Sequence, residues 1–398
     1  MSAHPVQGSR LVGFLAAGSG LAVASNYYAQ PLLPLLAQHF GVGTVQAGLV
    51  VTLSQIGYIV GLILLVPLGD RLERRALLTG TSALTALSLL GMALSPTFHV
   101  LVAMAVLAGL TSVTAQIIVP LAAHLAAPER RGRTVSTVMS GLLLGILLAR
   151  TASGAIAELG GWRAVYLVAA CLMAAFALLC RRWLPRIEPT AQGSYLSLLA
   201  SIFRLFREEP VLRRRGLMGA MSYGAFGAFW TSMAFMLGER HGFSEGVIGL
   251  FALVGAAGAV CARFAGRLAD AGWARLSTGG FLMLSAGSWW LLYAGEGSLI
   301  AFAAGIVLFD LGVQGAHISN QSEVYRLRPD ARSRLTTCYM SCYFAGGAIG
   351  SGLSAVLYHA HGWAGVCVLG AVMGGLAVIV WAATELSWPL AAMQRHGA

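Results

Sequence analysis

The chain contains 398 residues, of which 57% are hydrophobic and 10% are charged, and its mean hydropathy is +0.75. Soluble globular domains carry about 25% charged residues, so the composition excludes a soluble protein and predicts a protein embedded in a membrane. The formal net charge is +11. The basic clusters lack the interleaved aromatic residues that nucleic-acid binding uses, so we expect no nucleic-acid partner.

Apolar runs of about 20 residues, long enough to cross a hydrocarbon core of about 30 Å, occur along the whole chain. They predict an all-α polytopic membrane protein with twelve spans. The connections between the runs are short, so we expect no soluble domain. We expect the spans near residues 11–37, 45–69, 76–96, 98–124, 134–157, 163–184, 214–238, 246–268, 276–295, 298–322, 334–358 and 363–386.

An internal duplication relates the two halves of the chain. The sequence PERRGR at residues 128–133 is followed 201 residues later by PDARSR at residues 329–334. Gly161 and Gly362, each followed by a tryptophan, are separated by the same offset. The duplication predicts two pseudo-symmetric six-helix bundles in parallel. We place them at residues 1–184 and 214–398, joined by a cytoplasmic linker at residues 185–213.

The distribution of arginine predicts the orientation. All basic residues are arginines, and nearly all of them lie in the connections after the even-numbered spans. Because cytoplasmic loops carry the excess of Lys and Arg, both termini are predicted to be cytoplasmic, with the chain in the plasma (bacterial inner) membrane. A competing interpretation takes Arg10 and the apolar stretch to residue 24 as a cleaved secretory signal. Cleavage would leave eleven spans, so we favour an uncleaved first span.

The cysteines carry no sign of a disulfide or a metal site. All six lie inside predicted spans, and none forms a Cys-x-x-Cys pair. The sequence also contains no phosphate-binding loop. We therefore expect no cofactor, and any process that requires energy would draw on an ion or solute gradient.

The linker is predicted to form an amphipathic helix on the cytoplasmic leaflet. Arg204 and Arg207 lie off its apolar stripe. A tether between the halves is the simpler interpretation, and a regulatory role is the alternative. The stripe consists of Tyr195, Leu198, Leu199, Ile202 and Phe206.

Ionisable residues inside spans are informative, because a central Asp or Arg costs roughly 2.5 to 3.5 kcal/mol on insertion scales. Asp310 lies midway along the tenth span, and Arg150 lies in the outer half of the fifth. We interpret Asp310 as a proton-coupling site, because a partly dry cavity disfavours its ionised form. Arg150 would bias the proton affinity of Asp310 or bind an anionic group. The alternative is a standing salt bridge of Asp310 with Arg150 or Arg263.

The tenth span carries a polar stripe at helical spacing. His317 belongs to it and would relay protons, bind substrate or simply pack, so its role stays open. The stripe consists of Asp310, Gln314, His317 and Gln321.

The first span offers candidate substrate contacts at Asn26, Tyr27 and Gln30, where Pro31 and Pro34 are predicted to interrupt the helix. Polar and aromatic residues of other spans would complete a neutral lining. For each aromatic residue, packing or interfacial anchoring is the alternative. These further candidates are Gln55, Tyr58, Gln116, Trp230, Gln314, Asn320 and Tyr339.

Small residues recur every four positions in two spans that the duplication relates. Gly141 and Gly145 lie in the fifth span, and Cys342, Gly346 and Gly350 lie in the eleventh. Such spacing lets helices approach closely in lipid, so we expect tight helix packing there.

Motifs between the spans resemble those of the major facilitator superfamily, and the resemblance covers the whole chain. They are DRLERR at residues 70–75 and GRLAD at residues 266–270. The run NYYAQPLL at residues 26–33 is similar to the bacterial efflux branch that exports drugs, sugars and purine nucleosides. The resemblance implies two six-helix halves that rock around a central site and a functional monomer.

The loop motif also predicts a cytoplasmic gate, in which carboxylates at the end of one span meet arginines at the start of the next. The alternative is that these arginines only fix the topology. The chain departs from the family pattern, because Val66 and Glu73 replace usual glycines and the fifth span lacks the Gly-Pro of antiporters. The predicted gate residues are Asp70, Arg71, Arg74, Arg75, Asp270 and Arg275.

These observations predict a secondary transporter that moves a small neutral or amphiphilic solute by alternating access, through proton-coupled efflux. Its expected partners are a small-molecule substrate, protons and the lipid bilayer. The alternative is a proton-independent facilitator or importer of a small metabolite, in which Asp310 and Arg150 form a permanent bridge. A membrane-embedded enzyme would need a nucleophile with a base or a metal cluster. No such spacing occurs within a span, so we expect no enzyme.

Overall fold

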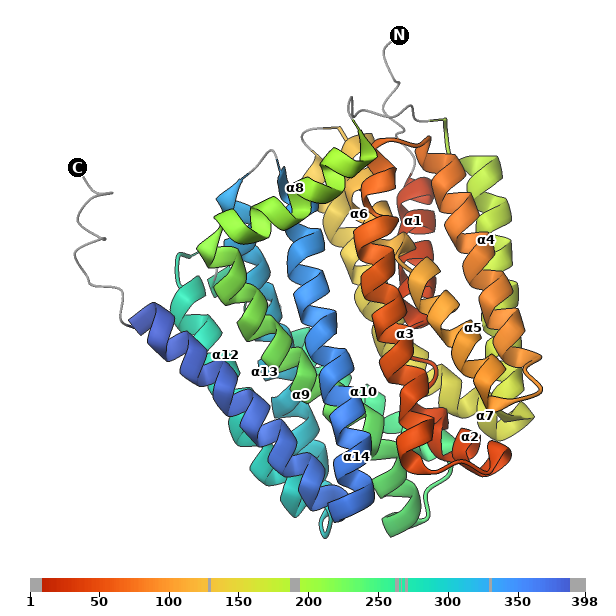
Figure 1. Cartoon of the computed structure of the whole chain (residues 1–398), viewed down its shortest axis with the longest axis vertical. Helices are drawn as coiled ribbons and strands as arrows, with labels where there is room; N and C mark the ends of the chain where they lie inside the picture. Colours follow the sequence, from red (N-terminus) through yellow and green to blue (C-terminus); the bar gives the residue numbers. More distant parts are fainter. Residues whose placement is uncertain are drawn as a thin grey trace. The chain divides into compact units, whose positions relative to one another are not determined.

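A computed structural model gives the fold (Figure 1). It describes residues 9–127, 130–186, 194–261, 265, 267–268, 271–328 and 331–386. Every regular element among these residues is a helix. Six of the described helices are long and apolar enough to cross a membrane, judged by length and composition.

The helices form two compact units. The first unit comprises Met1–Ile202 with Met233–Leu253, and the second comprises Phe203–Ser232 with Val254–Ala398. The predicted domain boundaries at residues 184 and 214 stay a prediction. The elements that lie wholly in the first unit are α1 (Ser9–Ala24), η1 (Gln30–Leu32), α2 (Leu33–Phe40), α3 (Thr44–Leu64), η2 (Pro67–Asp70), α4 (Arg74–Ala93), α5 (Phe98–Thr111), α6 (Thr114–Leu125) and α7 (Arg131–Trp183).

Three helices contribute residues to both units, namely α8 (Tyr195–Glu208), α9 (Pro210–His241) and α10 (Glu245–Cys261). The remaining elements belong to the second unit. They are α12 (Ala274–Ala294), α13 (Leu299–Leu327), α14 (Arg332–Trp381) and the π-helical turn η5 (Ala382–Leu386).

The first predicted span is interrupted, as its prolines predict. Helix α1 ends at Ala24, a series of turns follows, and the chain returns to helix in η1 and α2. Pro31 and Pro34 each stand at the first or second position of these new helical segments, where the missing N–H is not needed. The break therefore lies beside the candidate residues Asn26, Tyr27 and Gln30.

The fourth predicted span is also interrupted, which the sequence reasoning missed. Helix α5 ends at Thr111 and α6 begins at Thr114. The Thr111 hydroxyl donates to the Leu107 carbonyl at 2.8 Å, and the Ser112 hydroxyl donates to the Gly109 carbonyl at 3.1 Å. Hydroxyl side chains that bond neighbouring backbone carbonyls compete with helical geometry, so the polar pair provides a local cause for the break.

The duplication is visible in the backbone. Gly41 and Gly242 have φ of 62° and 65°, and Gly161 and Gly362 have φ of 75° and 61°. Each pair is separated by the same 201-residue offset. Positive φ favours glycine because it has no Cβ. Gly161 lies within α7 and Gly362 within α14, so each of these long helical runs changes direction at its glycine.

The glycine stripes pack as predicted. In the first unit, a Cβ on Gly145 would lie 2.4 Å from the Cα of Gly20 on α1. In the second unit, a Cβ on Gly350 would lie 1.9 Å from the carbonyl oxygen of Gly224 on α9. The α7 and α14 stripes therefore bring helix backbones into direct contact within each unit.

The predicted linker helix is present as α8 (Figure 1). Ile202 and Leu205 are buried, whereas Leu196 and Phe203 are exposed. The Tyr195 hydroxyl donates to the Leu64 carbonyl at 2.6 Å, and partial burial raises the pKa of this hydroxyl. Placement of α8 on the cytoplasmic leaflet stays a prediction.

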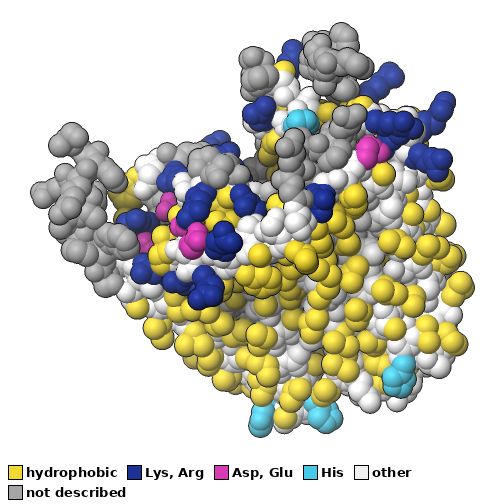
Figure 2. All heavy atoms as spheres, turned by 45° about the horizontal axis from the view of Figure 1, so that its top comes forward, with side chains coloured by type: hydrophobic (Ala, Val, Ile, Leu, Met, Phe, Trp, Pro, Cys, Tyr) yellow, Lys and Arg dark blue, Asp and Glu magenta, His cyan; other side chains and the backbone are white. Residues whose placement is uncertain are grey.

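Charge and apolar surface are separated on the outside of the chain. Figure 2 shows arginine side chains gathered in clusters, with apolar side chains covering much of the other surface in view. Large apolar residues in the described helices, such as Leu87, Leu178, Trp290 and Ile379, are exposed. Exposed apolar side chains of this size and number are typical of helices whose solvent is lipid.

Candidate functional site

The two interrupted spans meet inside the first unit. Asn26 lies in the turn after α1, and Ser112 lies in the break between α5 and α6. The Asn26 amide Nδ2 donates to Ser112 Oγ at 3.1 Å, and the Ser112 hydroxyl lies 3.3 Å from Asn26 Oδ1. Both side chains are buried. Sequence reasoning found Asn26 but missed Ser112, because no proline or glycine marks the second break.

Two predicted residues, Gln30 and Tyr27, contact Arg150 in α7. Arg150 is only 4% exposed. Its Nε donates to Gln30 Oε1 at 2.5 Å, and its guanidinium carbon lies 4.6 Å from the centroid of the Tyr27 ring. One turn along α7, the Ser153 hydroxyl donates to the Tyr28 carbonyl at 2.7 Å. Two contacts therefore hold the interrupted stretch of the first span against α7. The Gln30 side chain bonds Arg150, and the Tyr28 carbonyl bonds Ser153.

A second polar group in the first unit joins α3 to α6. The Gln116 amide Nε2 donates to the Tyr58 hydroxyl at 3.4 Å. Gln55, one turn before Tyr58, is buried, and its Oε1 has no hydrogen-bond partner within the described part of the chain. Of the predicted lining residues, the structure therefore pairs Tyr58 with Gln116.

Threonine pairs support the break between α5 and α6. Thr85 on α4 donates to Thr111 at 2.9 Å, and the hydroxyls of Thr81 and Thr114 lie 3.1 Å apart. These buried hydroxyls satisfy polar groups on both sides of the interruption. The pairs were not predicted, because single threonines in apolar spans carry no distinctive pattern.

The part of α7 just before Gly161 packs directly on the start of α10 within the first unit. The Thr151 hydroxyl donates to the Gly249 carbonyl at 2.9 Å. A Cβ on Gly154 would lie 2.2 Å from the Glu245 carbonyl oxygen, and the Ser244 hydroxyl donates to Glu158 at 3.3 Å. This close contact was also not predicted.

In the second unit, Asp310 on α13 faces the glycines of α10. Asp310 is 7% exposed. A Cβ on Gly255 would lie 2.1 Å from Asp310 Oδ2 and 3.4 Å from the Trp230 ring, and a Cβ on Gly258 would lie 3.2 Å from Asp310 Cβ. The structure therefore brings the predicted residues Asp310 and Trp230 together. Arg263 lies outside the described residues.

His317 occupies an aromatic environment on the same helix as Asp310. Its Nδ1 lies 3.1 Å from the Tyr339 hydroxyl. The imidazole centroid is 4.4 Å from the ring of Tyr343. Gln314, one turn before His317, is partly exposed. The structure thus joins two of the predicted residues, His317 and Tyr339, through one polar contact.

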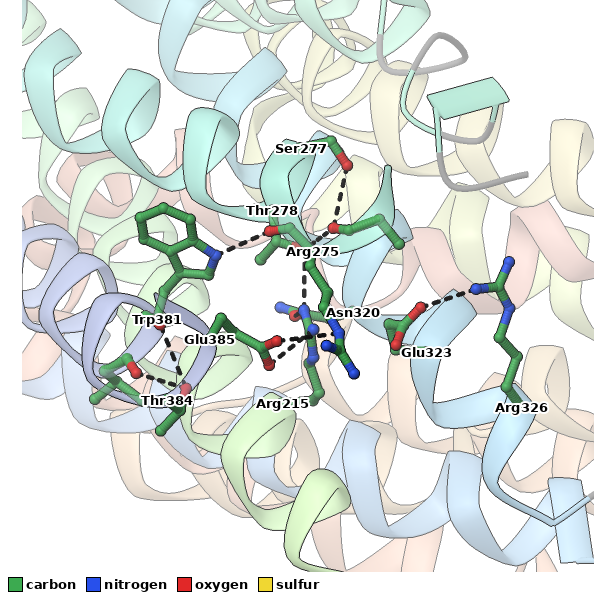
Figure 3. A network of polar contacts seen from close by, with 12 residues as sticks. Arg215, Arg275, Ser277, Thr278, Asn320, Glu323, Arg326, Trp381, Thr384 and Glu385 are labelled. Carbon is green, nitrogen blue, oxygen red and sulfur yellow. Dashed lines mark hydrogen bonds and ion pairs between the residues drawn. The ribbon is translucent and has the colours of Figure 1, made fainter. Parts of the chain in front are cut away.

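A buried arginine that sequence reasoning missed organises a polar network in the second unit (Figure 3). Arg215 is 1% exposed. Its Nη1 donates to Thr278 Oγ1 at 3.0 Å and to Asn320 Oδ1 at 3.2 Å, and its Nη2 donates to Glu385 Oε1 at 2.9 Å. The other Glu385 oxygen lies 3.4 Å from Arg275 Nε. The predicted residues Asn320 and Arg275 belong to this network.

Arg215 was overlooked because it is the last of three consecutive arginines. A run of arginines beside a span indicates topology alone. Arg215 directly precedes an apolar segment. Helical periodicity predicts that one of the three arginines there faces the interior of the protein.

The contacts that the structure gives for the predicted gate residues of the first unit are mostly with backbone atoms. Glu73 caps α4, because its carboxylate accepts from the backbone N–H groups of Arg75 and Ala76 at 3.0 and 3.1 Å. Arg74 Nε donates to the Gly69 carbonyl at 3.1 Å. Glu73 replaces the usual glycine of the family motif and supplies the N-cap that the helix requires.

The carboxylates of the gate are not placed. The Asp70 side chain and the whole of Asp270 lie outside the described residues. Arg71 is exposed, and Arg75 Nη1 donates to the Leu184 carbonyl at 3.5 Å. The latch formed by Asp70 therefore stays a prediction. Among the described residues, no group of three or more His, Cys, Asp or Glu side chains could hold a metal ion.

Interrupted helices, buried polar side chains and an apolar exterior together define an integral membrane protein of the transporter class. The chain matches the Major Facilitator Superfamily over residues 15–326. It belongs to that superfamily. The predicted fold class, an all-α polytopic membrane protein of 12 helices with the fold of this superfamily, is therefore confirmed.

Relatives and solved structures agree with this assignment. The chain is 48% identical to the uncharacterized transporter YgaY of Escherichia coli O157:H7, covering 93% of this chain and 94% of the relative. It is 34% identical to a probable transporter of Streptomyces coelicolor, covering 92% and 85%. The fold resembles an inward-facing, occupied bacterial homolog of the human lysosomal transporter Spinster, with a TM-score of 0.77, 14% identity and coverage of 97% and 98%.

Proposed function

We propose that the chain is a proton-coupled exporter of a small neutral or amphiphilic solute, working by alternating access. The proposal places it in the bacterial inner membrane with both termini cytoplasmic, supported by the distribution of arginine. The efflux direction is supported by the similarity of residues 26–33 to the efflux branch of the family.

The single observation that carries proton coupling is the position of Asp310. Its carboxyl is 7% exposed and lies against the glycine backbone of α10, beside Trp230. Burial in general disfavours the ionised form of a carboxyl, and hydration favours it. A movement of α10 that admits water would therefore release the proton. This couples the protonation of Asp310 to a helix movement.

The test is gradient-driven transport by purified protein in proteoliposomes. A panel of radiolabelled aromatic amides and carboxylates supplies the solutes, and an imposed pH difference supplies the energy. Exchange of one proton supports about tenfold accumulation per pH unit. We expect Asp310→Asn to abolish accumulation above equilibrium while solute exchange without a gradient persists.

Glu323→Gln provides the matched control, because Glu323 is a carboxylate on the same helix that pairs with Arg326 at 3.1 Å. It should accumulate solute like the unaltered protein. Full accumulation by Asp310→Asn would overturn the proton-coupling role. Equal rates with and without the gradient in the unaltered protein would favour the proton-independent facilitator.

A further inference from the structure

We infer that the exposed side of α8 binds anionic phospholipids of the adjacent membrane leaflet. The ligand is a lipid with a net negative headgroup, such as phosphatidylglycerol, recognised through its phosphate and the start of its acyl chains. The inference depends neither on proton coupling nor on the transported solute. The tests of the proposed function therefore neither support it nor overturn it.

Two contacts fix the ends of α8 at the ends of long apolar helices. At its start, the Tyr195 hydroxyl donates to the carbonyl of Leu64, the last residue of α3, at 2.6 Å. At its end, the C-cap residue of α13, Arg328, pairs with Glu208 at 3.3 Å and with Glu209 at 2.6 Å. Both α3 and α13 are long and apolar enough to cross a membrane. Because spans end where the hydrocarbon core meets the headgroups, α8 lies at the level of the headgroups.

Helix α8 packs on the protein with one side and exposes apolar residues on another. Ile202 and Leu205 are buried, whereas Leu196 and Phe203 are 73% and 59% exposed. Leu196 and Phe203 are seven positions apart in sequence, so they lie on the same side of the helix. Helices that lie in a membrane interface carry such residues on the side that enters the boundary between headgroups and acyl chains. The exposed apolar pair is therefore placed to contact lipid.

Arginines accompany the exposed apolar pair. Arg207 lies one turn beyond the pair on the same side of the helix, Arg204 lies beside it, and both arginines are exposed. The acidic residues that follow, Glu208 and Glu209, are engaged by Arg328. A guanidinium binds phosphate through paired hydrogen bonds, and basic residues at the membrane surface attract anionic lipids. The exposed side of α8 thus complements a lipid with an apolar body and a negatively charged headgroup.

A fluorophore on α8 of the full-length protein tests the inference. Ala200 is exposed between the apolar residues, so Ala200→Cys is labelled with bimane. The background variant is Cys171→Ser, because Cys171 is also exposed, and this variant alone supplies the blank. The protein is placed in phosphatidylcholine nanodiscs that contain a small fraction of a quencher lipid.

The quencher lipid is either phosphatidylglycerol or phosphatidylcholine, each carrying a nitroxide on the acyl chain close to the headgroup. Quenching of the bimane therefore reports which lipid lies beside α8. At equal content, we expect phosphatidylglycerol to quench more strongly than phosphatidylcholine. No quenching by either lipid would show that the exposed side of α8 faces water, and equal quenching by both would show that headgroup charge plays no part. Either result would overturn the inference.

Two double variants test the role of the arginines. Arg204→Gln with Arg207→Gln should lower the preference for phosphatidylglycerol by about fivefold or more, because one basic residue near an anionic lipid contributes about fivefold in affinity. Arg181→Gln with Arg182→Gln is the matched control, because it removes two exposed arginines from the end of α7. It should leave the preference unchanged. An unchanged preference in the α8 variant, or an equal fall in both variants, contradicts a lipid site on α8.

Discussion

Glu385→Ala is expected to destabilise the second unit by about 3–5 kcal/mol, because it leaves the buried guanidinium of Arg215 without its carboxylate. Glu385 Oε1 accepts from Arg215 Nη2 at 2.9 Å, and both side chains are largely shielded, with 10% and 1% exposure. For a domain of this size, the loss corresponds to a fall in unfolding temperature of roughly 10 °C. Thermal unfolding is measured in detergent. The readout is the labelling of the buried thiols Cys338 and Cys367 by a thiol-reactive dye.

The same carboxylate provides the control. Arg275 pairs with the other Glu385 oxygen at 3.4 Å but is 54% exposed, so Arg275→Ala should change stability by only about 0–1 kcal/mol. Similar losses for Glu385→Ala and Arg275→Ala would contradict the view that burial of Arg215 dominates.

The duplication supplies a sharper comparison. Arg215 and Glu385 correspond to Phe14 and Leu184 in the first unit, where Phe14 lies 5.3 Å from the ring of Trp183. Apolar side chains therefore stand in the first unit where the second unit has an ion pair. Replacing a buried ion pair by well-packed apolar residues is often neutral. We expect Arg215→Phe with Glu385→Leu to recover much of the stability that Glu385→Ala loses.

The fold could be predicted where a residue type limits the backbone or where lipid fixes the pattern. Hydrophobic runs located the spans, because every exposed face must be apolar. Pro31 and Pro34 located the first break, because proline lacks an N–H. Gly161 and Gly362 marked equivalent turns, because both require positive φ.

The missed features depend on tertiary contacts that no local pattern encodes. Ser112 in the second break contacts Asn26, which lies 86 positions away in sequence. Arg215 required Glu385 at the far end of the chain, so a run of arginines was attributed only to topology. Around the candidate site, sequence reasoning identified Arg150, Gln30 and Asp310 as rare polar residues in spans. It could not foresee which of them would touch.

Gly350→Val is expected to prevent correct assembly of the second unit. The new Cβ would lie 1.9 Å from the Gly224 carbonyl oxygen and 2.7 Å from its Cα. Both are backbone atoms of α9, so no side-chain rotation relieves the collision. Inserting groups into a packed core costs about 1–3 kcal/mol, and more when the backbone must move. In lipid, close packing itself holds helices together, so the yield of monodisperse protein on size exclusion should fall strongly.

Gly80→Ala is the matched control, because Gly80 lies in α4 and a Cβ there would meet no atom within 4 Å. Alanine is favoured over glycine within helices by roughly 0.5–1 kcal/mol, so this variant should be as stable as the unaltered protein or slightly more stable. Gly145→Val tests the equivalent contact of the first unit, where the Cβ would lie 2.4 Å from the Gly20 Cα. Two variants as well behaved as Gly80→Ala would show that α7 and α14 do not pack at these glycines, because a backbone collision cannot be tolerated where two helices touch.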